Sequence, residues 1–494
     1  MNTKGTTQMS DLPAQNKEAV DWRSDFVVMK FGGTSVEDAA AIRRVSQLVR
    51  GQLRHRPIVV VSALAEVTDQ LISAGKSAAE GRRESAKEIL ERLLQRHAGV
   101  AAELLSAEEH KNLCSELENA FQLLHSLVDS IAADGQFAPR VQDHFLGFGE
   151  FLSSKLVSAA FLAGDLDAAW VDARQCIITD AAHTRATPLW EETNQRVESV
   201  VIPLLQAGRV PVLGGFVGST RDGIPTTLGR GGSDFSAAIV GAALRAQRIE
   251  IWTDVDGVMT TDPDLCADAR LIEKMSFDEA AELAYFGAKV LHPATLLPAM
   301  RHDVPVWVRN SRNPKCSGTE ILAHTSDSIE VKAISVKRGV ASVDVEPLRW
   351  LAPELVREVC DVFERHHYSL DLLSASRGSL SVLVSTTAAL PAIAEELKGL
   401  ANVQWKNHQA LVCLVGEKIR RRPDIASRVF RAISDIDVRM ICQGASERNI
   451  SFLVDESKAE ETVRRLHRLF FPPQAIQPVD DRSHALCQAS GSWV

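Results

Sequence analysis

A glycine-rich stretch with an embedded arginine is the clearest sign of chemistry in this chain. It reads Thr226-Thr227-Leu228-Gly229-Arg230-Gly231-Gly232-Ser233-Asp234 and leads into an apolar, alanine-rich run over residues 235–244. Glycine has no Cβ, so successive backbone N–H groups can turn toward a ligand at little steric cost. Ser233 and Asp234 stand where a helix N-cap belongs, and the positive end of that helix would face the glycines. The stretch predicts a phosphate or carboxylate cradle; the competing interpretation is a plain turn before a buried helix.

Lys30 is a second candidate, because it closes the apolar run 26–31 and precedes Gly32 and Gly33. A buried strand, a two-glycine turn and a helix over 37–50 would place this lysine at the carboxyl end of the strand, where open α/β sheets hold ligands. The spacing is not that of a Walker A loop. We expect a lysine that faces a phosphate; the alternative is an edge lysine that reaches solvent.

Glu150 is a third candidate, on a small-sided helix predicted over 145–161 beside Gly147 and Gly149. A solvated surface glutamate is the simpler interpretation. A buried glutamate would need a cation, and a substrate ammonium group would serve.

A sheet is needed to bring these residues together. Apolar runs at 26–31, 57–63, 168–171, 211–216, 249–254 and 304–309 alternate with helical segments, which predicts an α/β fold: a three-layer αβα domain with a mainly parallel sheet, over residues 25–312. Residues 78–134 have the apolar spacing of a solvated helical layer. Residues 221–223 predict a hairpin. A helix over 277–291 should end or kink at Pro293, with Lys289 and His292 near its terminus.

The pattern changes after a boundary expected over 310–327. Residues 331–401 and 409–474 repeat one order of strands and helices, which predicts two ferredoxin-like modules of the βαββαβ type at 328–402 and 408–474. We expect residues 1–24 to form a flexible arm, neither a signal peptide nor a membrane anchor, and residues 475–494 an irregular tail.

The composition indicates a globular protein that acts on small molecules. A net charge of -9 disfavours a nucleic-acid backbone or an anionic membrane as partner. The eight cysteines show no CxxC and no pairing with histidine at metal-ligand spacing, so we expect reduced thiols in a cytoplasmic protein.

Four motifs together resemble the aspartate kinases, particularly the monofunctional lysine-sensitive type. They are Lys30-Phe31-Gly32-Gly33-Thr34-Ser35, the stretch 226–234, Ile251-Trp252-Thr253-Asp254-Val255 and Phe286-Gly287-Ala288-Lys289-Val290-Leu291-His292-Pro293. The resemblance covers about residues 26–470 and likens the two repeats to that family's paired ACT regulatory modules. It implies phosphoryl transfer from ATP, bound with Mg2+, to the β-carboxylate of L-aspartate, the first step toward lysine, threonine, methionine and diaminopimelate.

The resemblance also assigns roles to individual residues. Lys30 and Lys289 would contact the transferred phosphate, and Asp234 would hold the catalytic lysines. Arg230 would grip the substrate α-carboxylate as a fork and Glu150 its ammonium. The substrate-binding set is Thr68, Glu150, Arg230, Gly231, Gly232 and Ser233, and the nucleotide-binding set is Lys30, Gly32, Gly33, Ser62, Thr253, Asp254, Met259, Asp264, Lys289 and Val290, with Phe216 as a further candidate; no side chain is expected to ligate a metal.

The chain departs from the family's pattern in both parts. Met259 stands where the family usually has a tyrosine against the nucleotide, and Asp264 where it has an arginine near the phosphates. In the first ACT-like module, Asp371 remains, but residues 349–356 and Arg377 differ from the lysine-sensitive pattern. We therefore hypothesise that inhibition by lysine is weak or absent, and that the ACT-like modules bind another effector or none.

Two other functions are compatible with the sequence. The chain could be a kinase for another amino-acid carboxylate, such as glutamate or acetylglutamate, or a non-catalytic amino-acid sensor on a kinase scaffold. In either case, paired ACT modules favour a homodimer or a dimer of dimers.

Overall fold

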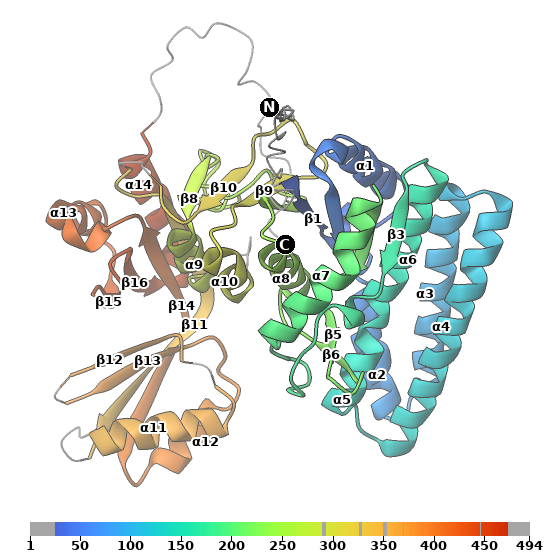
Figure 1. Ribbon diagram of the computed structural model, residues 1–494. Helices are drawn as coiled ribbons and strands as arrows, with labels where there is room; N and C mark the ends of the chain where they lie inside the picture. The colour runs from blue at the N-terminus through green and yellow to red at the C-terminus, as the bar shows by residue number, and fades with distance from the viewer. Residues whose placement is uncertain are drawn as a thin grey trace, which may run out of the picture.

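An eight-stranded sheet organises the amino-terminal part of the chain (Figure 1). The computed structural model describes residues 25–288, 293–325, 329–348, 353–368, 370–376, 378–444 and 446–472. The strands lie in the order β3-β4-β2-β1-β7-β9-β10-β8, and all neighbours are parallel except β9 and β10. Their bounds are β1 Val27–Phe31, β2 Pro57–Val61, β3 Ala168–Val171, β4 Val210–Gly214, β7 Arg248–Thr253, β8 Lys274–Ser276, β9 Val306–Asn310 and β10 Thr319–Leu322. The expected mainly parallel sheet is confirmed.

Helices cover both faces of this sheet, because successive side chains of its strands point to opposite sides. Val27, Met29 and Phe31 of β1 pack into one core, whereas Val28 packs into the other. Lys30 therefore lies on the side of Val28. The first face carries α1 Ala39–Arg50, α2 Val67–Ala79, α3 Arg83–Leu104, α4 Ala107–Asp134, α5 Pro139–Leu146 and α6 Phe148–Ala163, and the second carries α7 Trp190–Gln206, α8 Gly232–Ala243, α9 Phe277–Tyr285 and α10 Pro293–Arg301.

Three helices begin or end at residues other than those expected. The single helix predicted over 145–161 is two helices that meet at Gly147, which ends α5 and begins α6. Helix α8 begins at Gly232 with Gly231 as its N-cap, so Ser233 and Asp234 lie in its first turn rather than at the cap. Gly231 has a φ of 70°, a left-handed conformation that glycine adopts at little cost, and this places the start of the helix earlier than the side-chain pattern indicated.

Helix α9 is also shorter than predicted. It ends at Tyr285, and Gly287 follows with a φ of 107°, which breaks the helix before residue 291. Pro293 opens α10 instead of ending α9, as suits a residue with no N–H to donate. Lys289, Val290 and His292 lie outside the described residues.

The sheet also extends into the expected boundary. Strand β10 lies within residues 310–327 and pairs with β8 and β9, so the amino-terminal domain reaches Leu322 rather than residue 312. The predicted hairpin is present as β5 Val217–Ser219 and β6 Pro225–Thr227.

A six-stranded sheet, in the order β12-β13-β11-β14-β16-β15, organises the carboxyl-terminal part. Two of its strands, β11 and β14, are each 15 residues long and pair antiparallel along their length, with an irregularity between Lys337 and Ser342. The bounds are β11 Ala333–Pro347, α11 Pro353–Arg365, β12 Leu372–Ala375, β13 Leu380–Val384, α12 Leu390–Leu397, β14 Ala401–Val415, α13 Pro423–Ala432, β15 Val438–Cys442, β16 Asn449–Asp455 and α14 Ala459–Phe470.

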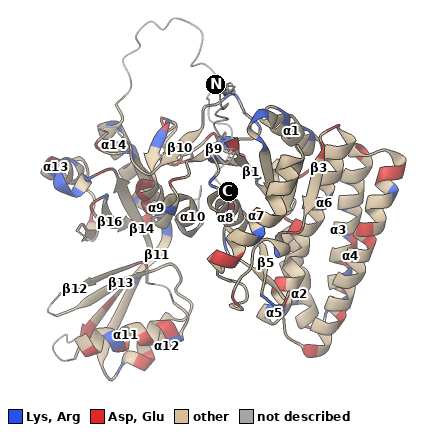
Figure 2. Cartoon of the chain, in the orientation of Figure 1, with Lys and Arg blue, Asp and Glu red and all other residues tan. Residues whose placement is uncertain are grey.

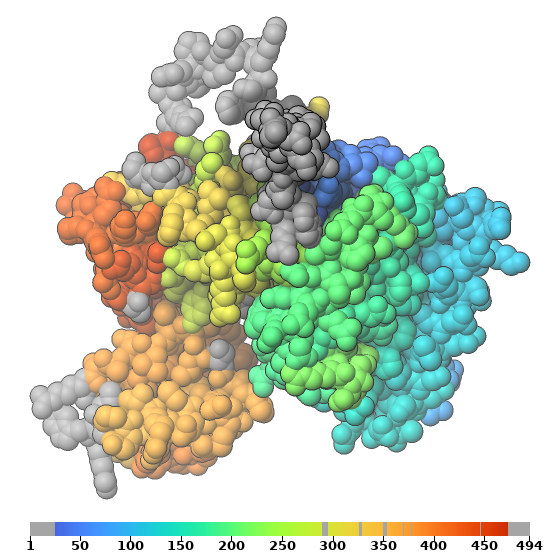
Figure 3. Space-filling model, viewed as in Figure 1, coloured from blue at the N-terminus to red at the C-terminus, as the bar shows by residue number. Residues whose placement is uncertain are grey.

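These long strands connect the two modules, so a division at residues 328–402 and 408–474 does not hold. One core combines Val331 and Ile334 at the start of β11 with residues from 410 onward. The other core lies between Ala341 and Val403. The first module is thus inserted into the second, and it forms a lobe of its own, orange in Figure 3. Local strand patterns could not reveal this, because each half of β11 packs with a different set of helices.

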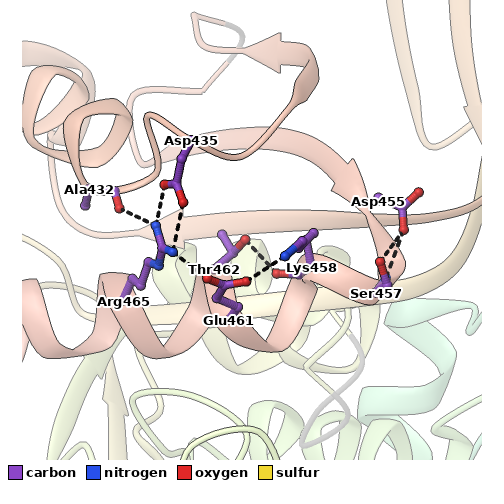
Figure 4. A network of polar contacts seen from close by, with 8 residues as sticks. All are labelled: Ala432, Asp435, Asp455, Ser457, Lys458, Glu461, Thr462 and Arg465. Atoms are coloured by element: carbon purple, nitrogen blue, oxygen red, sulfur yellow. Dashed lines mark hydrogen bonds and ion pairs between the residues drawn. The ribbon is translucent and has the colours of Figure 1, made fainter.

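Helix α11 of this part carries charged residues of both signs, drawn blue and red in Figure 2. On α14, the guanidinium of Arg465 donates to both carboxylate oxygens of Asp435, at 2.5 and 3.0 Å, and also contacts Glu461 (Figure 4). Asp455 accepts from the N–H and hydroxyl of Ser457 just before the helix. These exposed contacts orient α14 and add little stability each.

One helical run, Pro139–Ala163, is long and apolar enough to cross a membrane, but 72% of its most apolar window is buried inside the protein. It comprises α5 and α6, which pack against the first face of the sheet.

Candidate active site

Lys30 and Asp234 form a nearly buried ion pair at the carboxyl edge of the sheet. Lys30 is 8% exposed and points toward α8, and its Nζ lies 2.7 Å from Oδ1 of Asp234 in the first turn of that helix. Withdrawing two charges from water costs free energy unless their mutual attraction and further hydrogen bonds compensate for the lost hydration. The arrangement holds a lysine ammonium in a set direction at the edge where parallel sheets bind ligands.

Two glycines at the end of β4 allow two helices to approach this edge. A Cβ added to Gly214 would lie 2.8 Å from the carbonyl oxygen of Glu150, and one added to Gly215 would lie 2.7 Å from Cα of Ser233. Both distances are shorter than real Cβ contacts allow. The start of α6 and the start of α8 can therefore converge only because residues 214 and 215 lack side chains. These glycines were not among the expected site residues, although a glycine pair that closes an apolar strand is a signal that could have found them.

Glu150 is buried in the first turn of α6, so the solvated-surface interpretation is wrong. It is 4% exposed, and its Oε2 has no hydrogen-bond partner. Burial raises the pKa of this carboxyl from 4.5 to about 8, while hydrogen bonding to the backbone at Ala63 and at Glu150 itself and the charge of Lys30 oppose the rise. An unpaired, buried carboxylate oxygen is costly, and a ligand cation would satisfy it.

Arg230 extends from the loop that precedes α8. Its side chain is exposed and forms no ion pair with any residue that the structure describes. Gly229 and Gly231 on either side have φ values of 78° and 70°, which turn the backbone sharply. Gly232 packs against Phe216, because a Cβ there would lie 2.6 Å from its ring. Ser233 is buried. Within the described part of the chain, the arginine is thus an exposed cation without an ion-pair partner, on a tightly packed loop.

The glycine turn after β1 lies between two other strand ends. The N–H of Gly32 donates to the carbonyl of Trp252 at the end of β7, at 3.0 Å, and the N–H of Ser62 donates to the carbonyl of Phe31. A Cβ added to Gly32 would lie 3.7 Å from Nζ of Lys30, so the glycine turn passes close to the ammonium. Thr68 is half-buried in the first turn of α2, the helix that follows β2.

Four of the residues expected to bind a nucleotide lie at the end of β7 or after it. The hydroxyl of Thr253 donates to Oδ1 of Asp254 at 3.1 Å, and both side chains are half-buried. Met259 is half-buried and forms an isolated bridge with Leu271. Asp264 is exposed on a turn where its N–H donates to Oδ1 of Asp262 at 2.9 Å. Lys289 and Val290, the remaining members of this set, lie outside the described residues.

A separate cavity of about 320 Å³ lies between α4, α6 and β3. Aromatic rings of Phe148, Phe151 and Trp170 line it, and neither Lys30 nor Asp234 does. Among the described residues, no group of three or more histidine, cysteine, aspartate or glutamate side chains could hold a metal ion.

Comparison with known proteins gives a consistent picture. Residues 25–310 match the amino acid kinase family, and residues 412–470 match an ACT domain. The chain is 34% identical to the lysine-sensitive aspartokinase 3 of Escherichia coli over 91% of its own length and all of the relative's. Two crystal structures of E. coli aspartokinase III each superpose with a TM-score of 0.79: one with aspartate and ADP, described as the R-state, over 90% of this chain, and one with lysine and aspartate, described as the T-state, over 91%. Both cover all of the solved chain, at 34% identity.

Proposed function

Because this chain belongs to the aspartokinases of the amino acid kinase family, we propose that it transfers a phosphoryl group from ATP to the β-carboxylate of L-aspartate. The product is 4-phospho-L-aspartate, the first intermediate toward lysine, threonine, methionine and diaminopimelate.

The observation that carries this proposal is that one carboxylate and one guanidinium near the same sheet edge both lack a partner of opposite charge in the part of the chain that the structure describes. Among the described residues, the buried Oε2 of Glu150 has no hydrogen-bond partner and the exposed guanidinium of Arg230 forms no ion pair. An amino acid with a free ammonium and a free α-carboxylate complements both. An N-acylated substrate would leave Glu150 unsatisfied, which disfavours acetylglutamate.

The chain's residues then act by positioning and by charge. Arg230 and Glu150 orient the α-carbon of the substrate, with Thr68 and residues 231–233 completing the pocket. Lys30 directs positive charge at the transferred phosphoryl group, and Asp234 holds that ammonium in place. A loose, metaphosphate-like transition state needs such charge stabilisation more than covalent help. The attacking carboxylate has an ordinary pKa of about 3.9 and is already ionised, so no general base is required.

The site fits a nucleotide bound with Mg2+. Lys30 and the turn of Gly32 and Gly33 would face the phosphate oxygens, and Thr253, Asp254, Ser62 and Met259 would border the remainder of the nucleotide. Mg2+ is usually held by phosphates with one or two carboxylates and several waters, and it would supply further neutralisation of the phosphate charge when bound. Lys289 is proposed as the second lysine on the phosphates, and Val290 as its neighbour.

Trapping of the acyl phosphate tests the proposal directly. The full chain is incubated with ATP, Mg2+, hydroxylamine and either L-aspartate or L-glutamate, beside Lys30→Ala. We expect aspartyl hydroxamate from the wild type and at least a hundredfold less from the variant. Product from glutamate alone would establish a kinase for another substrate. No product with either amino acid, from a folded protein that binds lysine or threonine, would favour the sensor.

We also propose a cytoplasmic homodimer or dimer of dimers that contacts through the ACT-like part. Among the described residues, no strand pairs with the outer side of β12 or β15, and such edges are common subunit contacts. Sedimentation of the wild type beside a Met440→Pro variant, which alters the outer strand β15, would test whether subunits associate through this strand.

A further inference from the structure

Asp143 is a fully buried carboxylate that the proposed mechanism does not use. It lies on α5 with no exposed surface and accepts hydrogen bonds from three donors. These are the hydroxyl of Thr227 at 2.5 Å, Nδ1 of His183 at 2.6 Å, and the backbone N–H of Thr184 at 2.9 Å to Oδ1 and 3.1 Å to Oδ2. Such a carboxylate joins separate parts of the chain firmly, because each charge-assisted bond is stronger than a neutral one.

Two of the joined segments flank the loop of Arg230. Thr227 ends β6, three residues before the arginine. The segment around Thr184 lies against the next part of the loop: a Cβ on Gly229 would lie 3.1 Å from the carbonyl oxygen of Thr184. The N–H of Ala186 also donates to the carbonyl of Thr227, at 2.9 Å. The Asp143 carboxylate therefore binds both the strand end that precedes the arginine loop and the segment that packs against this loop.

The third joined part is the helix that carries Glu150. Gly147 ends α5 and begins α6, so Asp143 and Glu150 lie on two consecutive helices with no loop between them. Through Gly147, the position of Asp143 is linked to that of Glu150. One carboxylate thus connects the support of Arg230 with the support of Glu150.

We propose that Asp143 is a positioning residue that sets the distance between Arg230 and Glu150 and thereby the selection of a free α-amino acid. This inference rests on the proposed function, since it gives these two residues the α-carboxylate and the ammonium of the substrate. Asp143 touches no substrate itself. Its removal should weaken binding of the amino acid and leave binding of the nucleotide nearly unchanged, because Lys30 and Gly32 are held by other contacts.

Steady-state kinetics of Asp143→Asn give the first test. Asparagine keeps the shape but turns an amide NH2 toward groups that are themselves donors. We expect the KM for aspartate to rise about 10- to 100-fold, with less than about a threefold change in the KM for ATP. Asp172→Asn is the matched control. Asp143 and Asp172 both line the cavity of about 320 Å³ described above, but Asp172 binds the side chain and the backbone N–H of Arg174 instead of the arginine loop. An equal rise of both KM values in Asp143→Asn would overturn the proposal.

Thr227 supplies a milder pair of variants in case Asp143→Asn folds poorly. Thr227→Val removes the hydroxyl that donates to Asp143 and keeps the shape, whereas Thr227→Ser keeps the hydroxyl. We expect a raised KM for aspartate in Thr227→Val and recovery to near the wild-type value in Thr227→Ser. A Thr227→Ser variant as impaired as Thr227→Val would contradict the role of the hydrogen bond.

Amide hydrogen exchange separates this proposal from the proposed function. In Asp143→Asn or Thr227→Val, we expect residues 181–187 and 226–231 to exchange at least about tenfold faster, with β1 and β7 unchanged. Unchanged exchange in both segments would overturn the positioning role whatever the activity. Faster exchange in a protein whose wild type makes no aspartyl hydroxamate would instead reject the proposed substrate and retain the role of Asp143 as the link between the two supports.

Discussion

The ammonium of Lys30 lies 2.7 Å from the carboxylate of Asp234, and both groups are largely withdrawn from water. One residue comes from the first strand and the other from the first turn of α8, so the pair couples the centre of the sheet to the glycine-rich loop. Its geometry suggests that Asp234 acts by aiming the lysine rather than by proton transfer.

Substitution of Asp234 tests this role. We expect Asp234→Asn to lower kcat by about 10²-fold or more, since the lysine loses its partner and its direction, with a smaller effect on either KM. The control is Asp129→Asn. Asp129 lies on α4 and pairs at the surface with Lys87 of α3, so this change should leave kcat unchanged. A fall in kcat no larger than that of the control would show that the pair is only structural.

The raised pKa of Glu150 predicts a pH-dependent gain in stability for Glu150→Gln. The pKa is about 8 in the folded protein and near 4.5 when the carboxyl is solvated. Between these values the folded state retains a proton that the unfolded state releases, so the wild type loses stability as pH rises through this window. Glutamine does not titrate. The Tm of Glu150→Gln relative to the wild type should therefore increase from about pH 5 to about pH 8.

Thermal unfolding at several pH values checks this, with Glu108→Gln on the exposed start of α4 as the control. A Tm difference that is the same at all pH values would mean that Glu150 ionises normally.

Replacement of Arg230 by lysine tests whether this residue binds the substrate α-carboxylate through two parallel N–H groups or only through its charge. Lysine retains the charge but cannot bind a carboxylate through two parallel N–H groups. We expect Arg230→Lys to raise the KM for aspartate by about tenfold, equivalent to about 1.4 kcal/mol, and to leave the KM for ATP unchanged. Arg221→Lys, on the hairpin and paired with Glu192, is the matched control. An unaffected KM for aspartate would place the α-carboxylate elsewhere.

The close approach at Gly215 predicts a large effect from one methyl group. A Cβ there would lie 2.7 Å from Cα of Ser233, so α8 must shift. We expect Gly215→Ala to destabilise the fold by about 1–3 kcal/mol and to reduce activity more than stability alone would explain. Gly99 lies within α3 with open space around it, and Gly99→Ala should stabilise the protein by about 1 kcal/mol. Denaturant unfolding compares the two; equal effects would contradict the packing argument.

Regulation by lysine should be weak in this chain. Asp371, which the resemblance marks as part of the lysine-sensitive pattern, is already bound by Nζ of Lys337 at 2.7 Å and by the hydroxyl of Ser385 at 2.6 Å. An effector ammonium would have to displace the chain's own lysine. Arg377 and residues 349–352, which also motivated this expectation, lie outside the described residues. We expect only partial inhibition at millimolar lysine.

Lys337→Ala provides the complementary test, since it frees Asp371 and should increase sensitivity to lysine. Complete inhibition of the wild type at micromolar lysine would contradict the expectation.

Two hydrogen bonds join helix α9 of the amino-terminal part to the ACT-like part of the chain. The hydroxyl of Tyr285, at the end of α9, donates to the carbonyl of Asp371 at 2.8 Å, and Glu282 accepts from Asn449 at 2.6 Å. Residue 289, proposed for the phosphates, follows α9 by four residues. Helix α9 therefore contacts the ACT-like sheet through both Glu282 and Tyr285.

The sequence by itself determined the alternation of strands and helices and the identity of the chemical groups. Apolar runs, glycine turns and the repeat of ferredoxin-like elements are local features, so Lys30 at a strand end and the glycine-rich loop of Arg230 could be identified without coordinates. The tertiary structure decided which of these groups meet. The burial and raised pKa of Glu150, its unpaired oxygen, and the contact of Lys30 with Asp234 all depend on helices α6 and α8 converging at Gly214 and Gly215. The same holds for β11, whose two halves belong to different cores, because packing between distant segments leaves no periodic signal in either segment alone.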